Sequence, residues 1–141
     1  PIRKYKPGAK RRIENSGAAI WNISGKKINE LRGHTRDVCS VIFSPDGKSM
    51  LTGSCDKTAR LWDMSGTTIH TFAGHRGEVH AVAFSPDGKN ILTGSDDHTA
   101  RLWDLKGTML REFTGHLSHI RSVIFSLDGK YVLTGSADFY C

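Results

Sequence analysis

The sequence contains little cysteine, no long apolar run and no signal-peptide pattern. Only three cysteines, Cys39, Cys55 and Cys141, stand among the 141 residues, and no two of them form a Cys-x-x-Cys pair. A disulfide framework is therefore not indicated. No stretch is long and apolar enough to cross a bilayer, so no membrane contact is expected. The scarcity of cysteine and the missing signal pattern after Pro1 predict a reducing, cytoplasmic location.

Positive charge is concentrated at the N-terminal end. The formal net charge is +6, from 20 Lys and Arg against 14 Asp and Glu. The first twelve residues contain no acid and six basic residues: Arg3, Lys4, Lys6, Lys10, Arg11 and Arg12. Without these six, 14 basic residues face 14 acidic ones, so residues 13–141 are formally neutral. Residues 1–14 are interpreted as a basic arm or a degenerate strand, and such clustered cations can also neutralise nucleic-acid phosphates.

An internal repeat organises the rest of the chain. The segment LTGSCDKTARLWD at 51–63 returns as LTGSDDHTARLWD at 92–104, and Trp21, Trp62 and Trp103 are 41 residues apart. Aligning residues 34–74 with residues 75–115 requires no gap and gives 24 identities in 41 positions. A fixed period of this length is the signature of a repeat architecture.

Apolar runs and turn residues alternate within each repeat. The first full repeat has four short apolar or β-branched runs: Val38–Ser44, Ser49–Cys55, Thr58–Asp63 and Thr67–Phe72. Pro45 and Gly47, in the sequence Ser-Pro-Asp-Gly, suit the turn between the first two runs. Each repeat is therefore predicted to be a four-stranded antiparallel meander. The first run is apolar or small on both faces, which indicates that neighbouring sheets cover it on both sides.

These landmarks resemble the WD-repeat family. A Gly-His pair, a Ser-Pro-Asp-Gly turn, a Gly-Ser with a nearby Asp, and a Trp-Asp pair follow one another in each full repeat. The resemblance implies an all-β fold, a β-propeller of WD repeats. Residues 15–33 are expected to form a partial repeat of outer strands, residues 34–74 and 75–115 two full repeats, and residues 116–141 a truncated repeat. The prediction is an incomplete ring of two full four-stranded blades plus two half-blades. Since propellers use roughly four to eight blades, we expect either a fragment or self-association that completes a ring.

The resemblance also implies a hydrogen-bond network in each repeat. Its residues here are His34, Thr52, Asp56 and Trp62, then His75, Thr93, Asp97 and Trp103, with His116, Thr134 and Asp138 in the third repeat. In this family the indole N–H donates to the hydroxyl, the hydroxyl to the His and the His to the Asp. The same residue types form the triads of hydrolases, but an enzyme needs one reactive copy, whereas this set recurs with its groups mutually satisfied. We therefore expect a structural network, no catalytic residue and no enzyme activity.

Residues that differ between repeats at equivalent positions are the candidates for binding. On the face where partner contacts cluster in this family, these are Asp37, Cys39 and Cys55, then Glu78, His80 and Asp96, then His119, Arg121 and Ala137. A constant scaffold with a variable surface is typical of binding proteins. Cys39, Cys55, His80 and Asp96 also carry metal-ligating atoms, but their spacing has no metal-ligand signature, so no metal site is expected.

The sequence thus predicts a non-catalytic scaffold that binds a protein or peptide on the face near the Gly-His loops. The alternative is a nucleic-acid or ribonucleoprotein-associated protein that contacts its partner through the basic N-terminal arm. No cofactor is expected, because the glycines stand in turns and form no phosphate-binding loop between a strand and a helix.

Overall fold

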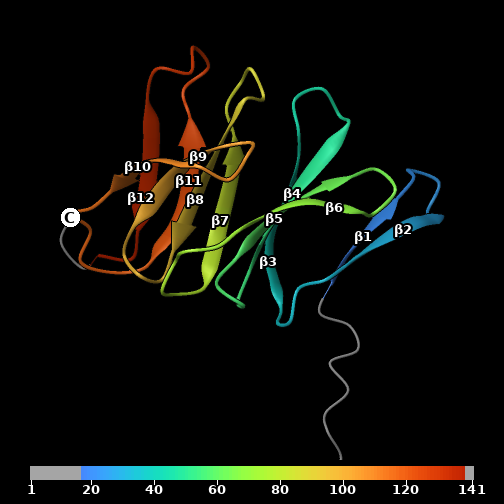
Figure 1. Cartoon of the computed structure of the whole chain (residues 1–141), viewed down its shortest axis with the longest axis horizontal. Helices are drawn as coiled ribbons and strands as arrows, with labels where there is room; N and C mark the ends of the chain where they lie inside the picture. The colour runs from blue at the N-terminus through green and yellow to red at the C-terminus, as the bar shows by residue number, and fades with distance from the viewer. Residues whose placement is uncertain (1–16, 139–141) are drawn as a thin grey trace, which may run out of the picture.

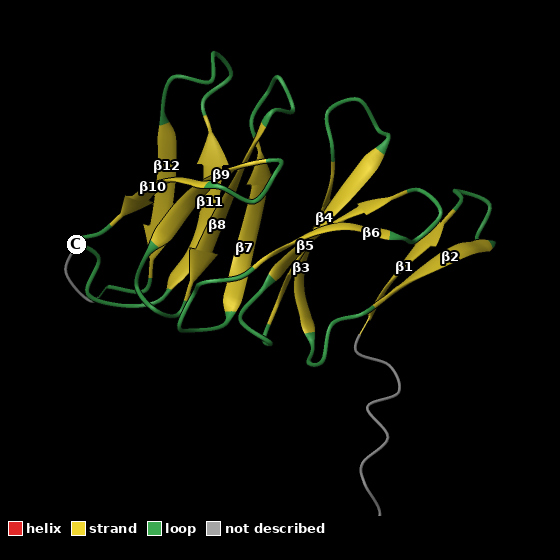
Figure 2. Ribbon diagram, in the orientation of Figure 1, coloured by secondary structure: helices red, strands yellow, loops and turns green. Residues whose placement is uncertain are grey.

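The computed structural model describes residues 17–138, and within them every regular element is a β-strand (Figure 2). The first strands are β1 (Gly17–Trp21) and β2 (Lys27–Arg32), followed by β3 (Val38–Phe43), β4 (Ser49–Ser54), β5 (Ala59–Asp63) and β6 (Thr68–Phe72). The second half contains β7 (Val79–Phe84), β8 (Asn90–Ser95), β9 (Ala100–Asp104), β10 (Met109–Phe113), β11 (Ile120–Phe125) and β12 (Val132–Ser136). Residues 1–16, which include the predicted basic arm, lie outside the described part.

The strands form two four-stranded and two two-stranded antiparallel sheets. Strands β3, β4, β5 and β6 pair in that order, and β7 to β10 repeat the arrangement. β1 pairs with β2 at one end, and β11 with β12 at the other. Figure 1 shows the sheets side by side, in chain order, as blades around an unclosed arc. The predicted fold, with two full blades plus two half-blades, is confirmed.

The strand ends differ from the prediction by one residue at several places. The predicted run to Ser44 ends at Phe43, because the Ser44 hydroxyl is used in the turn. Ser44 Oγ donates to Asp46 Oδ1 at 2.6 Å and accepts from the Ser49 N–H at 3.0 Å. Gly47 adopts a φ of 71° in this turn, a conformation that costs a residue without Cβ little. The side chain therefore determines the strand boundary here.

Each blade packs on the next through side chains. Val79 and Val82 of β7 share a buried cluster with Leu51 and Leu61 of the preceding blade. Gly53 of β4 allows this close approach, because a Cβ there would lie 2.9 Å from the Val79 carbonyl oxygen. Gly94 has the same place in the next blade, where a Cβ would lie 2.7 Å from Cγ2 of Ile120.

Apolar side chains are exposed at both ends of the described array. Val41 and Phe43 on β3 are 62% and 55% exposed, since β1 and β2 cover only the outer part of the first full blade. At the other end, Ile124 and Leu133 are 57% and 70% exposed. Both end blades therefore present surface that the inner blades bury.

Candidate functional site

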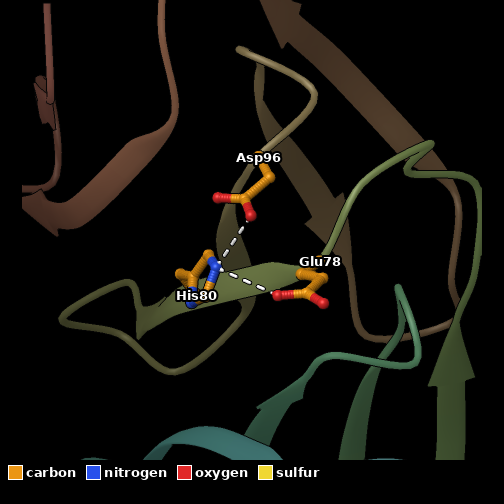
Figure 3. A group of neighbouring side chains, drawn as sticks. All are labelled: Glu78, His80 and Asp96. Carbon is orange, nitrogen blue, oxygen red and sulfur yellow. Dashed lines mark hydrogen bonds and ion pairs between the residues drawn. The ribbon is translucent and has the colours of Figure 1, made fainter.

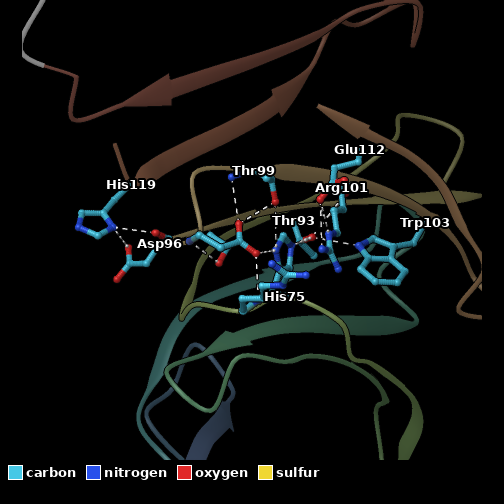
Figure 4. Close-up of polar contacts among 11 residues, drawn as sticks. His75, Thr93, Asp96, Thr99, Arg101, Trp103, Glu112 and His119 are labelled. Carbon is cyan, nitrogen blue, oxygen red and sulfur yellow. Dashed lines mark hydrogen bonds and ion pairs between the residues drawn. The ribbon is translucent and has the colours of Figure 1, made fainter. Parts of the chain in front are cut away.

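The structure assembles a hydrogen-bonded chain in each full blade. In the second, Trp103 Nε1 donates to Thr93 Oγ1 at 2.9 Å, Thr93 Oγ1 lies 2.7 Å from His75 Nε2, and His75 Nδ1 lies 2.7 Å from Asp97 Oδ2. Figure 4 shows Trp103, Thr93 and His75 joined in this order. The four residues come from four segments of one blade, so the hydrogen-bonded chain ties together its Gly-His loop, β8, β9 and the turn between those strands.

The first full blade reproduces this geometry. Trp62 Nε1 donates to Thr52 Oγ1 at 2.9 Å, and Thr52 Oγ1 lies 2.7 Å from His34 Nε2. His34 Nδ1 lies 2.7 Å from Asp56 Oδ2. Both threonine side chains are fully buried. The agreement within 0.1 Å between blades follows from their shared sequence.

The ionised carboxylate of Asp97 determines which ring nitrogen of His75 carries the hydrogen. An ionised Asp97 can only accept, so Nδ1 of His75 carries its hydrogen and Nε2 accepts from the Thr93 hydroxyl. Burial lowers the pKa of His75, although Asp97 acts in the opposite direction, and this keeps the imidazole neutral. Burial also raises the pKa of Asp97, but hydrogen bonds from Thr99, His75 and the Arg76 N–H outweigh it and lower that pKa to about 2.

The third repeat holds a shorter and more exposed version. His116 Nε2 lies 2.8 Å from Thr134 Oγ1, and His116 Nδ1 lies 2.9 Å from Asp138 Oδ2. No Trp follows Asp138 in the sequence, and the His116 side chain is 31% exposed, against 1% for His75. In the described residues this repeat has only β11 and β12, so its network lacks the cover that two further strands and the indole give in the full blades.

The geometry favours a structural role for these residues. Each hydroxyl oxygen in the full blades accepts from an indole N–H and contacts an imidazole, and none of its surface is open to a substrate. Two further residue pairs that sequence reasoning did not select complete the set. Thr99 donates to Asp97 through Oγ1 at 2.7 Å, and Ser95 Oγ accepts from the Asp97 N–H at 3.1 Å. Thr58 and Ser54 make the same hydrogen bonds with Asp56 in the first blade. Both residues are identical in the two aligned repeats, and this identity was the signal that could have identified them from the sequence.

The binding candidates lie at one end of the inner strands. Backbone bonds place them equivalently: the N–H of Cys55, Asp96 and Ala137 donates to the carbonyl of Asp37, Glu78 and His119 at 2.9, 2.9 and 3.0 Å. Each inner strand also begins with a β-bulge, and the extra residue is Cys39, His80 or Arg121. A bulge re-aims the side chain of the unpaired residue. The same backbone feature, a β-bulge, therefore presents a different side chain in each repeat.

Side chains from neighbouring repeats meet on this face. His80 Nε2 lies 3.0 Å from Asp96 Oδ2 and 3.4 Å from Glu78 Oε2. His119 of the third repeat reaches back so that its Nδ1 lies 3.0 Å from the Asp96 carbonyl oxygen (Figure 4). Arg36 of the first repeat, which sequence reasoning did not select, places Nη1 3.6 Å from Glu78 Oε1. The face is therefore continuous across three repeats.

Cys39 and Cys55 form the part of this face that belongs to the first full blade. Their Sγ atoms are 2.8 Å apart, and both are free thiols. Burial raises the pKa of Cys55 to about 12, and hydrogen bonds to Cys39 and Glu78 act in the same direction. The Cys55 thiol is therefore protonated at neutral pH.

Comparison with known families agrees with this architecture. The family described as WD domain, G-beta repeat matches residues 25–63, 66–104 and 107–141. The chain belongs to the WD40 repeat family. The matched segments begin 41 residues apart, two residues before the outer strand that precedes each Gly-His pair. WD40 repeat proteins are generally non-catalytic scaffolds, and membership of the family implies that the chain is a scaffold for protein interaction.

Individual WD40 relatives match over one repeat's length. Apoptotic protease-activating factor 1 of Mus musculus is 50% identical to this chain over 42 residues, and the Homo sapiens protein is 48% identical over 42 residues. Each match covers 29% of this chain and 3% of the relative. In residues 17–138 no helix is long and apolar enough to span a membrane.

Proposed function

We propose that this WD40 chain is an interaction scaffold that binds a protein or peptide on the face formed by the starts of the inner strands and the tight turns. The observation that carries this proposal is the contrast on that face. Its backbone is the same in three repeats, while the side chains at the bulge are a thiol, an imidazole and a guanidinium, at Cys39, His80 and Arg121. A partner that contacts several blades meets a different chemistry at each.

The charges on this face indicate a partner with polar, mixed-charge side chains. Arg36 and Arg121 are more than half exposed, and the carboxylates of Glu78 and Asp96 lie between them. Exposed ion pairs of this kind contribute little to folding stability, roughly 0–1 kcal/mol, so a partner's charges can replace them at low cost.

The test is a peptide selection followed by binding measurements. Phage-displayed peptides selected on the immobilised chain are titrated against the wild type, Arg121→Ala, and Lys89→Ala as the control. Lys89 directly follows the Ser-Pro-Asp-Gly turn at the opposite end of β7. We expect the Arg121 variant to lose affinity and the control to retain it. Selected peptides that bind Arg121→Ala normally and lose affinity for Lys89→Ala would place the binding surface elsewhere.

A second candidate function is supported by the charge of the N-terminal arm, which lies outside the described residues. Six Lys and Arg without an acid in the first twelve residues suit a nucleic-acid or ribonucleoprotein contact. Titration of a fluorescent single-stranded RNA against the chain with and without residues 1–12 tests it. Equal binding by the two chains, or binding that does not weaken as salt rises, would eliminate this candidate.

Self-association is a third prediction, and the exposed Val41, Phe43, Ile124 and Leu133 support it. We propose that copies of the chain cover these end faces for one another. Light scattering on a sizing column is expected to give a discrete dimer or trimer, and a monodisperse monomer would contradict the proposal.

A reducing, cytoplasmic location is likewise proposed from the scarcity of cysteine.

A further inference from the structure

Glu78, His80 and Asp96 converge in the second full blade. Glu78 directly precedes β7, His80 is the bulged residue at the start of β7, and Asp96 directly follows β8. The hydrogen bond from the Asp96 N–H to the Glu78 carbonyl, 2.9 Å long, holds the two backbone segments together. Figure 3 shows the two carboxylates directed at one ring nitrogen of His80 from different sides.

The side chains of this cluster offer fewer hydrogen-bond donors than acceptors. Nε2 of His80 carries at most one hydrogen, yet it faces Asp96 Oδ2 at 3.0 Å and Glu78 Oε2 at 3.4 Å. One of these carboxylate oxygens is therefore left without a donor from His80. Asp96 Oδ1 is fully buried and accepts no hydrogen bond. His119 Nδ1 lies 3.2 Å from this oxygen but is directed at the Asp96 carbonyl instead.

The nearby arginines do not neutralise the carboxylate oxygens that face His80. Arg36 approaches the outer oxygen of Glu78, Oε1, and Arg121 lies 3.9 Å from Asp96 Oδ1. Both guanidinium groups are mostly exposed, so solvent screens them. The oxygens that face His80, Oε2 and Oδ2, receive neither. Two anions and an imidazole without enough hydrogens form an arrangement that a small cation satisfies.

We propose that Glu78, His80 and Asp96 bind a divalent transition-metal ion of the zinc type. The ligand atoms would be His80 Nε2 and one carboxylate oxygen from each acid. Bonds of about 2.0–2.1 Å in a tetrahedral site hold ligand atoms roughly 3.3 Å apart, and the two separations from Nε2 are 3.0 and 3.4 Å. The three ligand atoms all lie within 4.8 Å of one another. Imidazole combined with carboxylates suits Zn²⁺ better than Ca²⁺ or Mg²⁺, which prefer oxygen ligands alone.

The proposed site is specific to the second repeat. The equivalent residues of the third repeat, His119, Arg121 and Ala137, offer no carboxylate. The equivalent residues of the first repeat are Asp37, Cys39 and Cys55, and within residues 17–138 only Glu78, His80 and Asp96 bring three ligand atoms within 4.8 Å of one another. This proposal departs from the sequence-based expectation of no metal site. The ligands come from a bulge and a distant turn, so their spacing along the chain follows no common ligand motif.

Calorimetric titration of the full chain with ZnCl₂ tests the site. We expect one Zn²⁺ per chain, and affinity lower by about tenfold or more in His80→Ala and in Asp96→Asn, because even groups behind the ligands contribute roughly 10–100-fold. His98→Asn is the matched control. It removes an exposed imidazole two residues beyond Asp96, and Asn tolerates the φ of 72° found there. Circular dichroism establishes that each variant is folded.

Titration with CoCl₂ separates the proposed ligands from the thiols. Imidazole and carboxylate ligands give visible bands without the intense near-ultraviolet band of a cobalt–thiolate bond. Three results would each overturn the proposal: no saturable binding by the wild type, unchanged affinity in both His80→Ala and Asp96→Asn, or a cobalt–thiolate band that disappears in the Cys39→Ser, Cys55→Ser double variant. An equal loss in His98→Asn and His80→Ala would also contradict it.

Discussion

Thr93→Val tests the buried network with almost no change of shape. The substitution replaces one hydroxyl by a methyl group in a side chain that is fully buried. It removes the acceptor of the Trp103 indole N–H, 2.9 Å away, and the donor to His75 Nε2, 2.7 Å away. Leaving a buried polar group unpaired costs about 1–3 kcal/mol. With two groups affected and some relaxation, we expect the free energy of unfolding to fall by about 2–4 kcal/mol.

Thr134→Val is the matched control in the truncated repeat. Among the described residues its hydroxyl hydrogen-bonds only His116, and the His116 side chain is 31% exposed, so water can replace the lost bond. We expect a cost of about 1 kcal/mol or less. Urea unfolding of both variants, followed by circular dichroism and by tryptophan fluorescence, measures the difference. A loss for Thr93→Val that is no larger than that for Thr134→Val would refute the reasoning, because burial of the network would then contribute nothing.

Two further predictions concern packing and pH. Gly94→Ala is expected to destabilise the chain by about 1–3 kcal/mol, because a Cβ there would lie 2.7 Å from Ile120, whereas Gly135→Ala, whose Cβ would be 3.5 Å from its nearest neighbour, is expected to cost less than about 1 kcal/mol in thermal melts. Stability is expected to fall as the pH drops below about 6.5, because the lowered pKa of His75 means that the unfolded chain binds the proton first, and to fall again between about 3.8 and 2 as Asp97 is protonated. Urea midpoints measured from pH 8 to pH 2 check this, and a stability that rises on acidification through pH 6 would contradict it.

Much of the fold is readable from the sequence because the repeats are read against each other. The Ser-Pro-Asp-Gly turns, the Trp-Asp pairs and the constant period define four strands in each full blade, and the structure contains them. The missed boundary at Ser44 has a local cause. This small residue follows a mostly apolar run and so extends the strand pattern, but its hydroxyl bonds Asp46 and Ser49 in the turn. Side-chain competition of this kind has no signature in periodicity.

The geometry of the candidate face was less predictable. The repeated landmarks indicate that Glu78, His80 and Asp96 belong to equivalent variable positions, but not that their ligand atoms meet. Their meeting depends on the bulge at His80, which breaks the strict alternation of a strand and redirects one side chain. Arg36 was missed for a related reason, since its contact with Glu78 crosses between blades. Contacts between repeats cannot be inferred from the pattern within one repeat.

The packing of Gly53 on Val79 and of Gly94 on Ile120 has a consequence for how such a chain can evolve. Each blade offers the same receiving surface on one side and the same inserted strand on the other, and no hydrogen-bonded ladder crosses the junction in residues 17–138. A duplicated segment of DNA that encodes one repeat therefore supplies both halves of a ready-made junction. Copy number can change without a new interface having to arise, and the residues at the bulges are then free to diverge in each copy.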